Sequence, residues 1–356
     1  MYAIIMAGGS GTRFWPRSRE NHPKQFLSIH EKQSLLEATI GRIHDLIGWD
    51  HIFIAANRNH EAFLNACVSR VPEQNVIYEP VGKNTAPCVG LTALYVQQRD
   101  KSGVLVIMPA DHLIRKKAAF KKAILTGHKI AKEKKGMVTI GIRPTRPATG
   151  YGYIQIANEI PADPGAKAYT VKTFAEKPNQ ETAGRFLSSG DFLWNSGIFI
   201  IPSEVYLDAV KQFLPDLYAG LMEIRRAMHK PYFNEVLNRV YRQIKGVSID
   251  YGLMEKAGNV YTVRGEFSWN DLGSWEQVYD ISKKDAEGNA VSGEALFVDT
   301  RDSYVYSQEG LVAMVGLENV IVVRDGDAIL VCARDRAEDV KKVTEWLRAK
   351  KMTSYL

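Results

Sequence analysis

The sequence has little cysteine and no long apolar run. Only three of its 356 residues are cysteine, namely Cys67, Cys88 and Cys332, and no two of them form a C-x-x-C pair. This argues against both a disulfide framework and a zinc site, and it favours a reducing compartment. The apolar run YAIIMA at the N-terminus is too short for a signal-peptide core, and no later run approaches the ~20 residues needed to cross a bilayer. We therefore expect a cytoplasmic protein without a membrane partner.

An excess of charge of one sign is also lacking. The chain carries 46 Lys and Arg against 40 Asp and Glu, which gives a net charge of +6. The densest basic stretch, residues 115–135, has apolar residues at helical spacing, so its lysines fall on the opposite, solvated face of a predicted helix. The alternative is a stripe that binds polyanions. Because the surplus lacks interleaved aromatics and a recognisable motif, we expect no nucleic-acid partner.

Strand-like runs alternate with amphipathic helical windows over the first 140 residues. The runs include YAIIMA, HIFIAA, NVIYEP, GVLVIMPADH and MVTIGI, and the helical windows cover 34–46, 60–71, 85–99 and 115–135. This alternation predicts right-handed crossovers and a mostly parallel sheet covered on both faces. Ser34 and either Asn84 or Thr85 are placed to cap two of the helices, and Pro87 falls in a first turn, where no backbone donor is missed.

The pattern changes in the second half of the chain. Residues 150 to about 285 mix further strands with helices, which we interpret as a widening of the same sheet. After the polar stretch KKDAEGN come short apolar runs separated by turn pairs such as D-G, and then an amphipathic helix over 337–350. We therefore predict an α/β domain over 1–285 and a small C-terminal β unit with a closing helix over 286–356.

A glycine-rich loop, GGSGTR, follows the first predicted strand. In an open parallel sheet this loop lies where ligands bind, and its glycines let backbone amides form a concavity for anions. Two known phosphate loops do not fit, because no lysine follows Gly11 in the Walker register and Phe14 stands where a dinucleotide fingerprint needs glycine. Together with Lys24 the loop offers amides, a guanidinium and an ammonium, which suit a nucleoside triphosphate. For the glycines alone, a plain tight turn is an equal alternative.

Two aspartates are candidates for a metal site. Asp111 follows a strand that reads as buried, so it should lie at the same sheet edge as the glycine loop. Taken alone, such an acid is more often a cap or turn residue. Beside a triphosphate it is the hard oxygen ligand that Mg²⁺ takes. Asp271 in SWNDLGSW is a candidate second acid, although periodicity does not bring it to Asp111.

Eight motifs resemble the sugar-nucleotide pyrophosphorylases, a family of nucleotidyltransferases. In order they are AGGSGTRFWPRSRENHPKQF, EPVGKNTAP, PADH, GYGYI, FAEKP, WNSGIFI, SIDYGLMEK and WNDLGSW, and they extend over nearly the whole chain. The resemblance implies a Rossmann-like nucleotidyltransferase fold with a mixed, mostly parallel central sheet, followed by a β-helix-like unit and a terminal helix. It is strongest to members that convert GTP and mannose 1-phosphate to GDP-mannose and diphosphate, and it implies Mg²⁺ as cofactor and a homodimer.

The resemblance also implies roles for individual residues. The nucleotide would be bound by Gly8, Gly9, Gly11, Thr12, Arg13, Lys24, Glu79, Asn84, Thr85 and Ala86. The sugar phosphate would be bound by Gly152, Glu176, Lys177, Asn195 and Asp250. Asp111 and Asp271 would hold Mg²⁺, and the catalytic set would be Arg13, Lys24, Asp111, Lys177 and Asp271. Each motif has a purely structural interpretation as a turn, cap or packing element, and only the ordered set favours the functional one.

Some features depart from the family pattern. Lys83 stands where the family usually has arginine, which replaces a planar fork by a point charge, and Phe14 stands where leucine is frequent. The sequence ends before the isomerase domain of longer relatives, so no phosphomannose isomerase activity is expected. Two alternatives stay open. One is a pyrophosphorylase for another nucleotide and hexose 1-phosphate, and the other is a non-catalytic regulator that senses nucleotide sugars.

Overall fold

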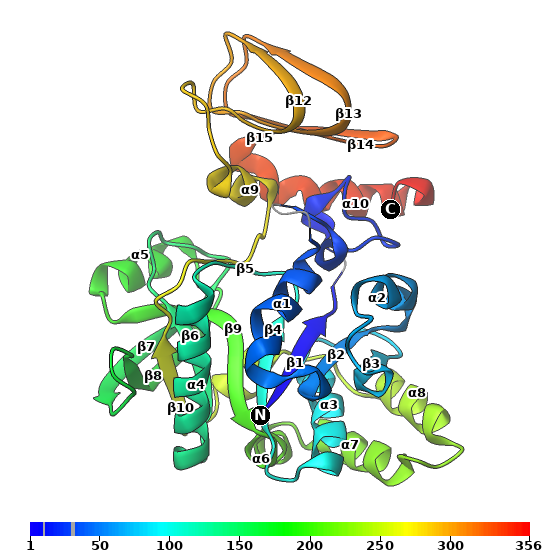
Figure 1. Ribbon diagram of the computed structural model, residues 1–356, viewed down its shortest axis with the longest axis vertical. Coiled ribbons are helices and arrows are strands. Elements are labelled where there is room, and N and C mark those ends of the chain that lie inside the picture. The colour runs from blue at the N-terminus through cyan, green and yellow to red at the C-terminus, as the bar shows by residue number, and fades with distance from the viewer. Residues whose placement is uncertain (10, 30–32) are drawn as a thin grey trace.

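The computed structural model describes residues 1–9, 11–29 and 33–356, so Ser10 of the glycine loop lies outside it (Figure 1). The strands of the main sheet are β1 (Tyr2–Ala7), β2 (Ile52–Asn57), β3 (Val76–Glu79), β4 (Val104–Pro109), β6 (Met137–Ile142), β7 (Gly152–Ile160), β8 (Ala168–Glu176), β9 (Phe192–Pro202) and β10 (Val260–Arg264). The helices around it are α1 (Leu35–Ile47), α2 (Glu61–Cys67), α3 (Thr85–Arg99), α4 (Lys117–Lys134), α5 (Gln180–Ser189), α6 (Ser203–Phe213), α7 (Pro215–Ala227), α8 (Phe233–Gln243) and α9 (Trp275–Ile281).

The main sheet has the strand order β3-β2-β1-β4-β9-β6-β10-β8-β7. The strands β3, β2, β1 and β4 pair in parallel, as the alternation of the first 140 residues predicts. Beyond β4 the long strand β9 runs antiparallel to β4, β6 and β7, and only β6 and β10 pair in parallel. The α/β fold with a mixed central sheet is thereby confirmed, and residues 150–285 do widen the first sheet. The expectation of a mostly parallel sheet is wrong, because the strands added after β6 include β7, β8 and β9, whose pairings in the described residues are antiparallel.

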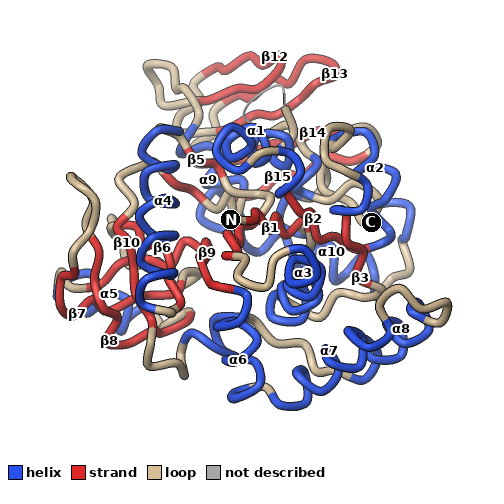
Figure 2. Tube along the Cα trace, turned by 60° about the horizontal axis from the view of Figure 1, so that its bottom comes forward, coloured by secondary structure: helices blue, strands red, loops and turns tan. Residues whose placement is uncertain are grey.

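Helices cover both faces of this sheet, as Figure 2 shows for α1, α3 and α4. Side chains alternate along β1, so Ala3, Ile5 and Ala7 pack in one core with residues of α1 and α4. Tyr2 and Ile4 point the other way, into a second core with residues of α3, α6, α7 and α8. Because both faces of the main sheet are buried, nearly every position along its strands is apolar, as the sequence shows.

Local signals fix several helix ends. Ser34 forms a capping box with Glu37 at the start of α1, and the Asn84 side chain accepts the Thr85 N–H at the start of α3. The window predicted over 60–71 is only partly helical, because α2 ends at Cys67. Pro72 disfavours the helical conformation at Val71, but the helix ends four residues before that, at Cys67. The basic stretch forms α4, whose buried side includes Phe120, Ile124 and Ile130.

The C-terminal unit is a second, four-stranded sheet. It consists of β12 (Ala290–Val298), β13 (Tyr304–Val315), β14 (Val320–Asp325) and β15 (Ala328–Ala333), followed by α10 (Val340–Ala349). The runs SYVYS and LVAMVG, predicted as separate, form the single strand β13. The parallel pairs β12–β13 and β13–β14 agree with a β-helix-like unit. In Figure 1 this sheet lies beyond α9 and α10, away from the main sheet.

The C-terminal unit packs on the segment that follows the glycine loop. Phe14 and Trp15 share a core with Trp275 of α9 and Tyr306 of β13. The Trp15 indole N–H donates to the Tyr355 carbonyl at 2.8 Å, which ties this segment to the last residues of the chain. In the described part of the chain, no helix is both long and apolar enough to cross a membrane.

Candidate active site

The glycine loop and Asp111 lie at the same edge of the main sheet. The loop follows β1 and Asp111 follows β4, and these two strands are parallel neighbours. A cavity of about 240 Å³ at this edge is lined by Gly11, Thr12, Arg13, Lys24, Asp111 and Asp271, among others. The structure thus brings six of the predicted residues to one place.

A short pair of strands brings Asp271 to Asp111. β5 (Leu113–Ile114) follows Asp111 closely, and β11 (Trp269–Asn270) immediately precedes Asp271. The two strands pair antiparallel, with Asn270 opposite Leu113. This register juxtaposes two aspartates that are far apart in the sequence, which no local pattern could predict.

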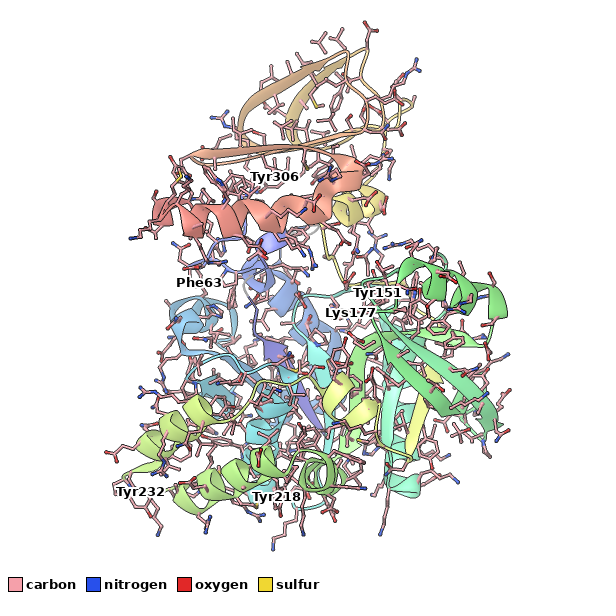
Figure 3. All side chains as sticks on the ribbon, turned by 180° about the vertical axis from the view of Figure 1, so that it is seen from behind. Phe63, Tyr151, Lys177, Tyr218, Tyr232 and Tyr306 are labelled. Carbon is pink, nitrogen blue, oxygen red and sulfur yellow. The ribbon has the colours of Figure 1, made fainter. Side chains whose placement is uncertain are left out.

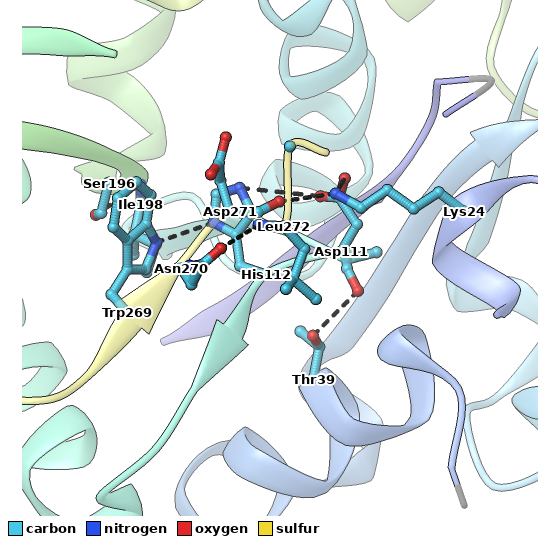
Figure 4. Close-up of polar contacts among 12 residues, drawn as sticks. Lys24, Thr39, Asp111, His112, Ser196, Ile198, Trp269, Asn270, Asp271 and Leu272 are labelled. Carbon is cyan, nitrogen blue, oxygen red and sulfur yellow. Dashed lines mark hydrogen bonds and ion pairs between the residues drawn. The ribbon is translucent and has the colours of Figure 1, made fainter. Parts of the chain in front are cut away.

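Lys24 connects the two aspartates (Figure 4). Its Nζ donates to Asp111 Oδ2 at 2.7 Å and to the Asp271 backbone carbonyl, also at 2.7 Å. Lys24 is only 6% exposed, whereas the Asp111 side chain is 32% exposed toward the cavity. Loss of solvent is the largest single effect and raises the pKa of Asp111, but the charge of Lys24 and the hydrogen bonds to the carboxylate together outweigh it, so the net pKa is lowered. The Asp111 carboxylate is therefore ionised at neutral pH.

His112 is a site residue that the sequence did not single out, although it lies inside the PADH motif. Burial lowers its pKa, so the imidazole is neutral at pH 7. The Trp269 indole N–H donates to its Nδ1 at 3.2 Å, which leaves the ring proton on Nε2. Nε2 lies 3.9 Å from Asp111 Oδ1. A neutral N–H thus faces the second oxygen of the Asp111 carboxylate.

The Asp271 carboxylate is held by Tyr151, which precedes β7. The Tyr151 hydroxyl donates to Asp271 Oδ1 at 2.7 Å, and Gln277 Nε2 donates to the Tyr151 hydroxyl at 3.3 Å. Burial and the Asp271 charge raise the pKa of Tyr151 far above neutrality, so the phenol stays a donor. Tyr151 lies inside the GYGYI motif, whereas no sequence signal marks Gln277.

The predicted sugar-phosphate residues line an adjoining cavity of about 210 Å³, together with Thr85 and Asp271. They are Gly152, Glu176, Lys177, Asn195 and Asp250. Figure 3 shows Lys177 beside Tyr151 at the end of the β7 and β8 sheet region. A Cβ at Gly152 would meet Glu176 Oε2, so a larger residue there would displace the Glu176 carboxylate. Because Asp271 lines both cavities, the nucleotide-loop side and the sugar side meet at this residue.

Hydrogen bonds fix the polar groups of the sugar-side cavity. Asn195 Nδ2 donates to Asp250 Oδ1 at 2.8 Å, and its Oδ1 accepts from the Thr139 hydroxyl at 2.9 Å. Lys177 Nζ pairs with Glu176 Oε1 at 3.1 Å, while its side chain is 58% exposed. Lys177 is therefore accessible to an anion that enters the cavity.

Two acids of this cavity have raised pKa values. Burial, followed by repulsion from Asp250, raises the pKa of Glu176 to about 7. Burial also raises the pKa of Asp250, against the opposing hydrogen bond from Asn195. Glu176 Oε2 is buried without a hydrogen-bond partner in the described residues. A sugar hydroxyl that donates a hydrogen bond to this oxygen would give it the partner that it lacks.

The raised pKa of Glu176 predicts a pH-dependent stability. Between the ordinary glutamate pKa of 4.5, which applies in the unfolded chain, and about 7, the folded protein binds more protons than the unfolded chain. The contribution of Glu176 to the free energy of unfolding therefore falls as pH rises through this window. The side chain introduced by Glu176→Gln does not titrate. The free energy of unfolding of the variant, relative to that of the wild type, should therefore be higher at pH 8 than at pH 5 by roughly 2 kcal/mol. Urea unfolding at both pH values measures this, with exposed Glu159→Gln as the control. An equal gain at both pH values would contradict the assigned burial.

The predicted nucleotide residues of EPVGKNTAP lie apart from the Lys24 cavity. Glu79 ends β3, and burial raises its pKa to about 7, against hydrogen bonds to Cys88 and Tyr241. Asn84 has a φ of 70° and caps α3, and Ala86 is buried with its N–H donated to the Val247 carbonyl. Thr85 alone of these lines the sugar-side cavity. Gly8 and Gly9 are exposed and line neither the Lys24 cavity nor the spaces adjoining it.

A third cavity of about 530 Å³ adjoins the other two and is lined by Arg13, Lys177 and Asp271. It also contains Arg146, a cation that the sequence did not single out, whose guanidinium carbon lies 5.8 Å from the centre of the Tyr151 ring. Three cations therefore surround space next to the Asp271 carboxylate. Such an arrangement suits a polyphosphate.

The donor set at this edge fits a magnesium ion. Within the described residues no three or more His, Cys, Asp or Glu side chains form a complete metal cage. Mg²⁺ does not need one, because it typically takes one or two carboxylates and fills its shell with phosphates and water. Asp111 and Asp271 supply two carboxylates, and the Lys24 ammonium, bound by the Asp111 carboxylate and the Asp271 backbone carbonyl, shows that this place stabilises positive charge.

Comparison with known proteins identifies the family to which the chain belongs. The Nucleotidyl transferase family model matches residues 2–288, and a MannoseP isomerase/GMP-like beta-helix domain model matches residues 293–347. The chain therefore belongs to the nucleotidyltransferase family. Within that family it is a member of the mannose-1-phosphate guanylyltransferases, to which its curated relatives belong.

Three relatives illustrate the similarity. Mannose-1-phosphate guanylyltransferases from Escherichia coli and Klebsiella pneumoniae are each 37% identical over 355 residues, which is 99% of this chain and 75% of theirs. A solved structure from Thermus thermophilus, described as a mannose-1-phosphate geranyltransferase, is 33% identical with a TM-score of 0.88. That match covers 98% of this chain and 99% of the other. The nucleotidyltransferase fold with its C-terminal β unit is thus confirmed at full length.

Proposed function

We propose that this protein transfers GMP from GTP to mannose 1-phosphate, which gives GDP-mannose and diphosphate. The observation that carries the proposal is the meeting of Lys24, Asp111 and Asp271 between the glycine loop and the sugar-side cavity. The identity to curated guanylyltransferases over nearly the whole chain supports the choice of GTP and mannose 1-phosphate. Glu79, Asn84, Thr85 and Ala86 are the residues that we assign to the guanine and ribose.

The reaction needs no general base. A phosphate oxygen of mannose 1-phosphate is already ionised, so the protein has only to align it opposite the leaving diphosphate and to offset the meeting of two anions. Lys177 is accessible and lies beside Asp271, so it receives the sugar phosphate. Arg13 and Lys24 stabilise the leaving diphosphate, with the amides of Gly11 and Thr12 at the loop.

The sugar is oriented by groups that are already in place. Glu176, Asn195 and Asp250 present carboxylate and amide groups to the hydroxyls. The hydrogen bond from Asn195 to Asp250 limits the motion of those two side chains, and the ion pair with Lys177 restrains Glu176. Asp111 and Asp271 would hold Mg²⁺, which when bound supplies positive charge to the α-phosphate. Lys24 must exchange its contact with Asp111 for phosphate oxygens when the nucleotide binds.

A grid of substrates tests the proposal. Purified protein is mixed with each of four nucleoside triphosphates and with mannose, glucose or galactose 1-phosphate, with and without Mg²⁺, and diphosphate release is measured. We expect GTP with mannose 1-phosphate and Mg²⁺ to give the fastest release. A faster rate with another pair would favour the other pyrophosphorylases, for which the Lys83 substitution leaves room. Nucleotide binding without any turnover would favour a non-catalytic regulator and contradict the proposal.

Two further properties belong to this proposal. We assign the catalytic domain to residues 1–285 and the β unit to residues 286–356, and we expect a cytoplasmic homodimer. Exposed apolar side chains on β12, β13 and β15 support a subunit contact there, namely Leu296, Val298, Leu311, Val315, Ile329 and Val331. The molar mass in solution tests the dimer, and a monomer at working concentration would contradict it.

A further inference from the structure

Tyr151 connects the two halves of the proposed site. Its hydroxyl donates to Asp271 Oδ1 at 2.7 Å, and its backbone carbonyl accepts the Lys177 N–H at 3.2 Å. The residue is 9% exposed, and its ring packs edge-on against Trp194 and Trp269 with centroid distances of 5.0 and 5.1 Å. With aromatic neighbours on two strands, the ring has little freedom to rotate. The position of the hydroxyl is therefore set by the sheet.

Gln277 holds the same network from α9. Its Nε2 donates to the Tyr151 hydroxyl at 3.3 Å, and its Oε1 accepts the Gly273 N–H at 2.8 Å. The side chain is buried, so both ends of the amide have a protein partner in place of water. Asp271 is thus restrained twice, at its carboxylate through Tyr151 and in its loop through Gly273.

We propose that Tyr151, supported by Gln277, is a positioning residue that fixes the Asp271 carboxylate for the metal ion. The inference rests on the proposed function, because the metal belongs to it. Carboxylates that bind metals are themselves held by hydrogen bonds, and loss of such a partner typically costs 10- to 100-fold in metal affinity. Without the Tyr151 hydroxyl, the carboxylate can rotate, and ordering it opposes metal binding.

The test is the affinity for Mn²⁺, measured by electron paramagnetic resonance on the full chain saturated with GDP-mannose. Tyr151→Phe keeps the ring and removes only the hydroxyl, so the fold should persist by circular dichroism. We expect its Kd for Mn²⁺ to rise roughly 10-fold. Turnover should fall at low Mg²⁺ and recover as Mg²⁺ is raised, which a merely structural role would not produce.

Tyr153→Phe is a matched control. Tyr153 lies two residues further on, is fully buried, and has a hydroxyl without a hydrogen-bond partner among the described residues. Its variant removes the same hydroxyl two residues along the chain without touching Asp271, so its Kd for Mn²⁺ should equal that of the wild type. A rise equal to that of Tyr151→Phe would overturn the inference.

Further outcomes separate the inference from the proposed function. If the wild type binds Mn²⁺ and Tyr151→Phe binds it equally well, the inference is wrong and the proposed function stands. If the wild type binds no Mn²⁺ with GDP-mannose present, the proposed metal and the inference fall together. Combining Tyr151→Phe with Gln277→Met should add little to the larger single effect, since the two residues act through one chain of contacts. Independent, multiplying effects would contradict the supporting role of Gln277.

Discussion

Asp111→Asn is expected to lower turnover by a factor on the order of 10² or more while the fold is retained, as the loss of a central electrostatic group usually does. The carboxylate lies at 2.7 Å from Lys24 Nζ and lines the cavity that also contains Arg13 and Asp271. Asparagine has nearly the same shape as aspartate, but it lacks the negative charge that pairs with Lys24 and that attracts a divalent cation. Initial rates of diphosphate release at saturating GTP and mannose 1-phosphate measure the effect.

Asp45→Asn is the control for this variant. Asp45 also pairs with lysines, at 2.8 Å to Lys117 and 3.2 Å to Lys121, but it lies on the outer side of α1. An exposed ion pair contributes little to stability, and Asp45 lies outside the proposed site, so the turnover of Asp45→Asn should match that of the wild type. Near-normal turnover of Asp111→Asn would remove Asp111 from the mechanism.

Gly11→Ala should have a comparably large effect, through geometry and not through charge. Gly11 has a φ of 60°, and a Cβ there would overlap the Lys24 Cβ and lie 2.9 Å from Ser18 Oγ and 3.1 Å from the Lys24 backbone nitrogen. The methyl group must displace Lys24 or the loop. A displacement of about 1 Å in a site of this kind can cost roughly 100-fold in turnover. Rates of GDP-mannose formation test this.

Gly184→Ala supplies the comparison for Gly11→Ala. Gly184 lies in α5, and a Cβ there has no neighbour within 4 Å among the described atoms. Alanine favours a helix over glycine by about 1 kcal/mol, so this variant should be stable and fully active. If Gly11→Ala retained wild-type turnover, the close approach of the loop to Lys24 would have no catalytic role.

Much of the fold can be read from the sequence because the signals are local. The capping box of Ser34 and Glu37 and the Asn84 cap mark helix starts through adjacent residues. The alternation of apolar runs and helical windows gives the parallel strands β3, β2, β1 and β4. The antiparallel pairings of β9 with β4, β6 and β7 depend instead on contacts between distant segments, and no periodicity encodes them.

The residues of the candidate site also divide into those that local sequence signals predict and those that depend on contacts between distant segments. The glycine loop, Lys24 and Asp111 can be predicted, because loops after parallel strands meet at one edge. The approach of Asp271 to Asp111 depends on the pairing of β11 with β5, two strands of two residues each that carry almost no pattern. The roles of His112 and Gln277 and the raised pKa of Glu176 arise from burial and neighbours, which only the folded chain supplies.

The most direct measurement is a crystal structure of the protein with GDP-mannose and Mn²⁺, in which anomalous scattering locates the metal. The account predicts one manganese ion bound by oxygens of both Asp111 and Asp271 and by the nucleotide. It also predicts that Gly11 and Thr12 face the phosphates. A metal that touches neither aspartate, or a loop turned away from the nucleotide, would contradict it.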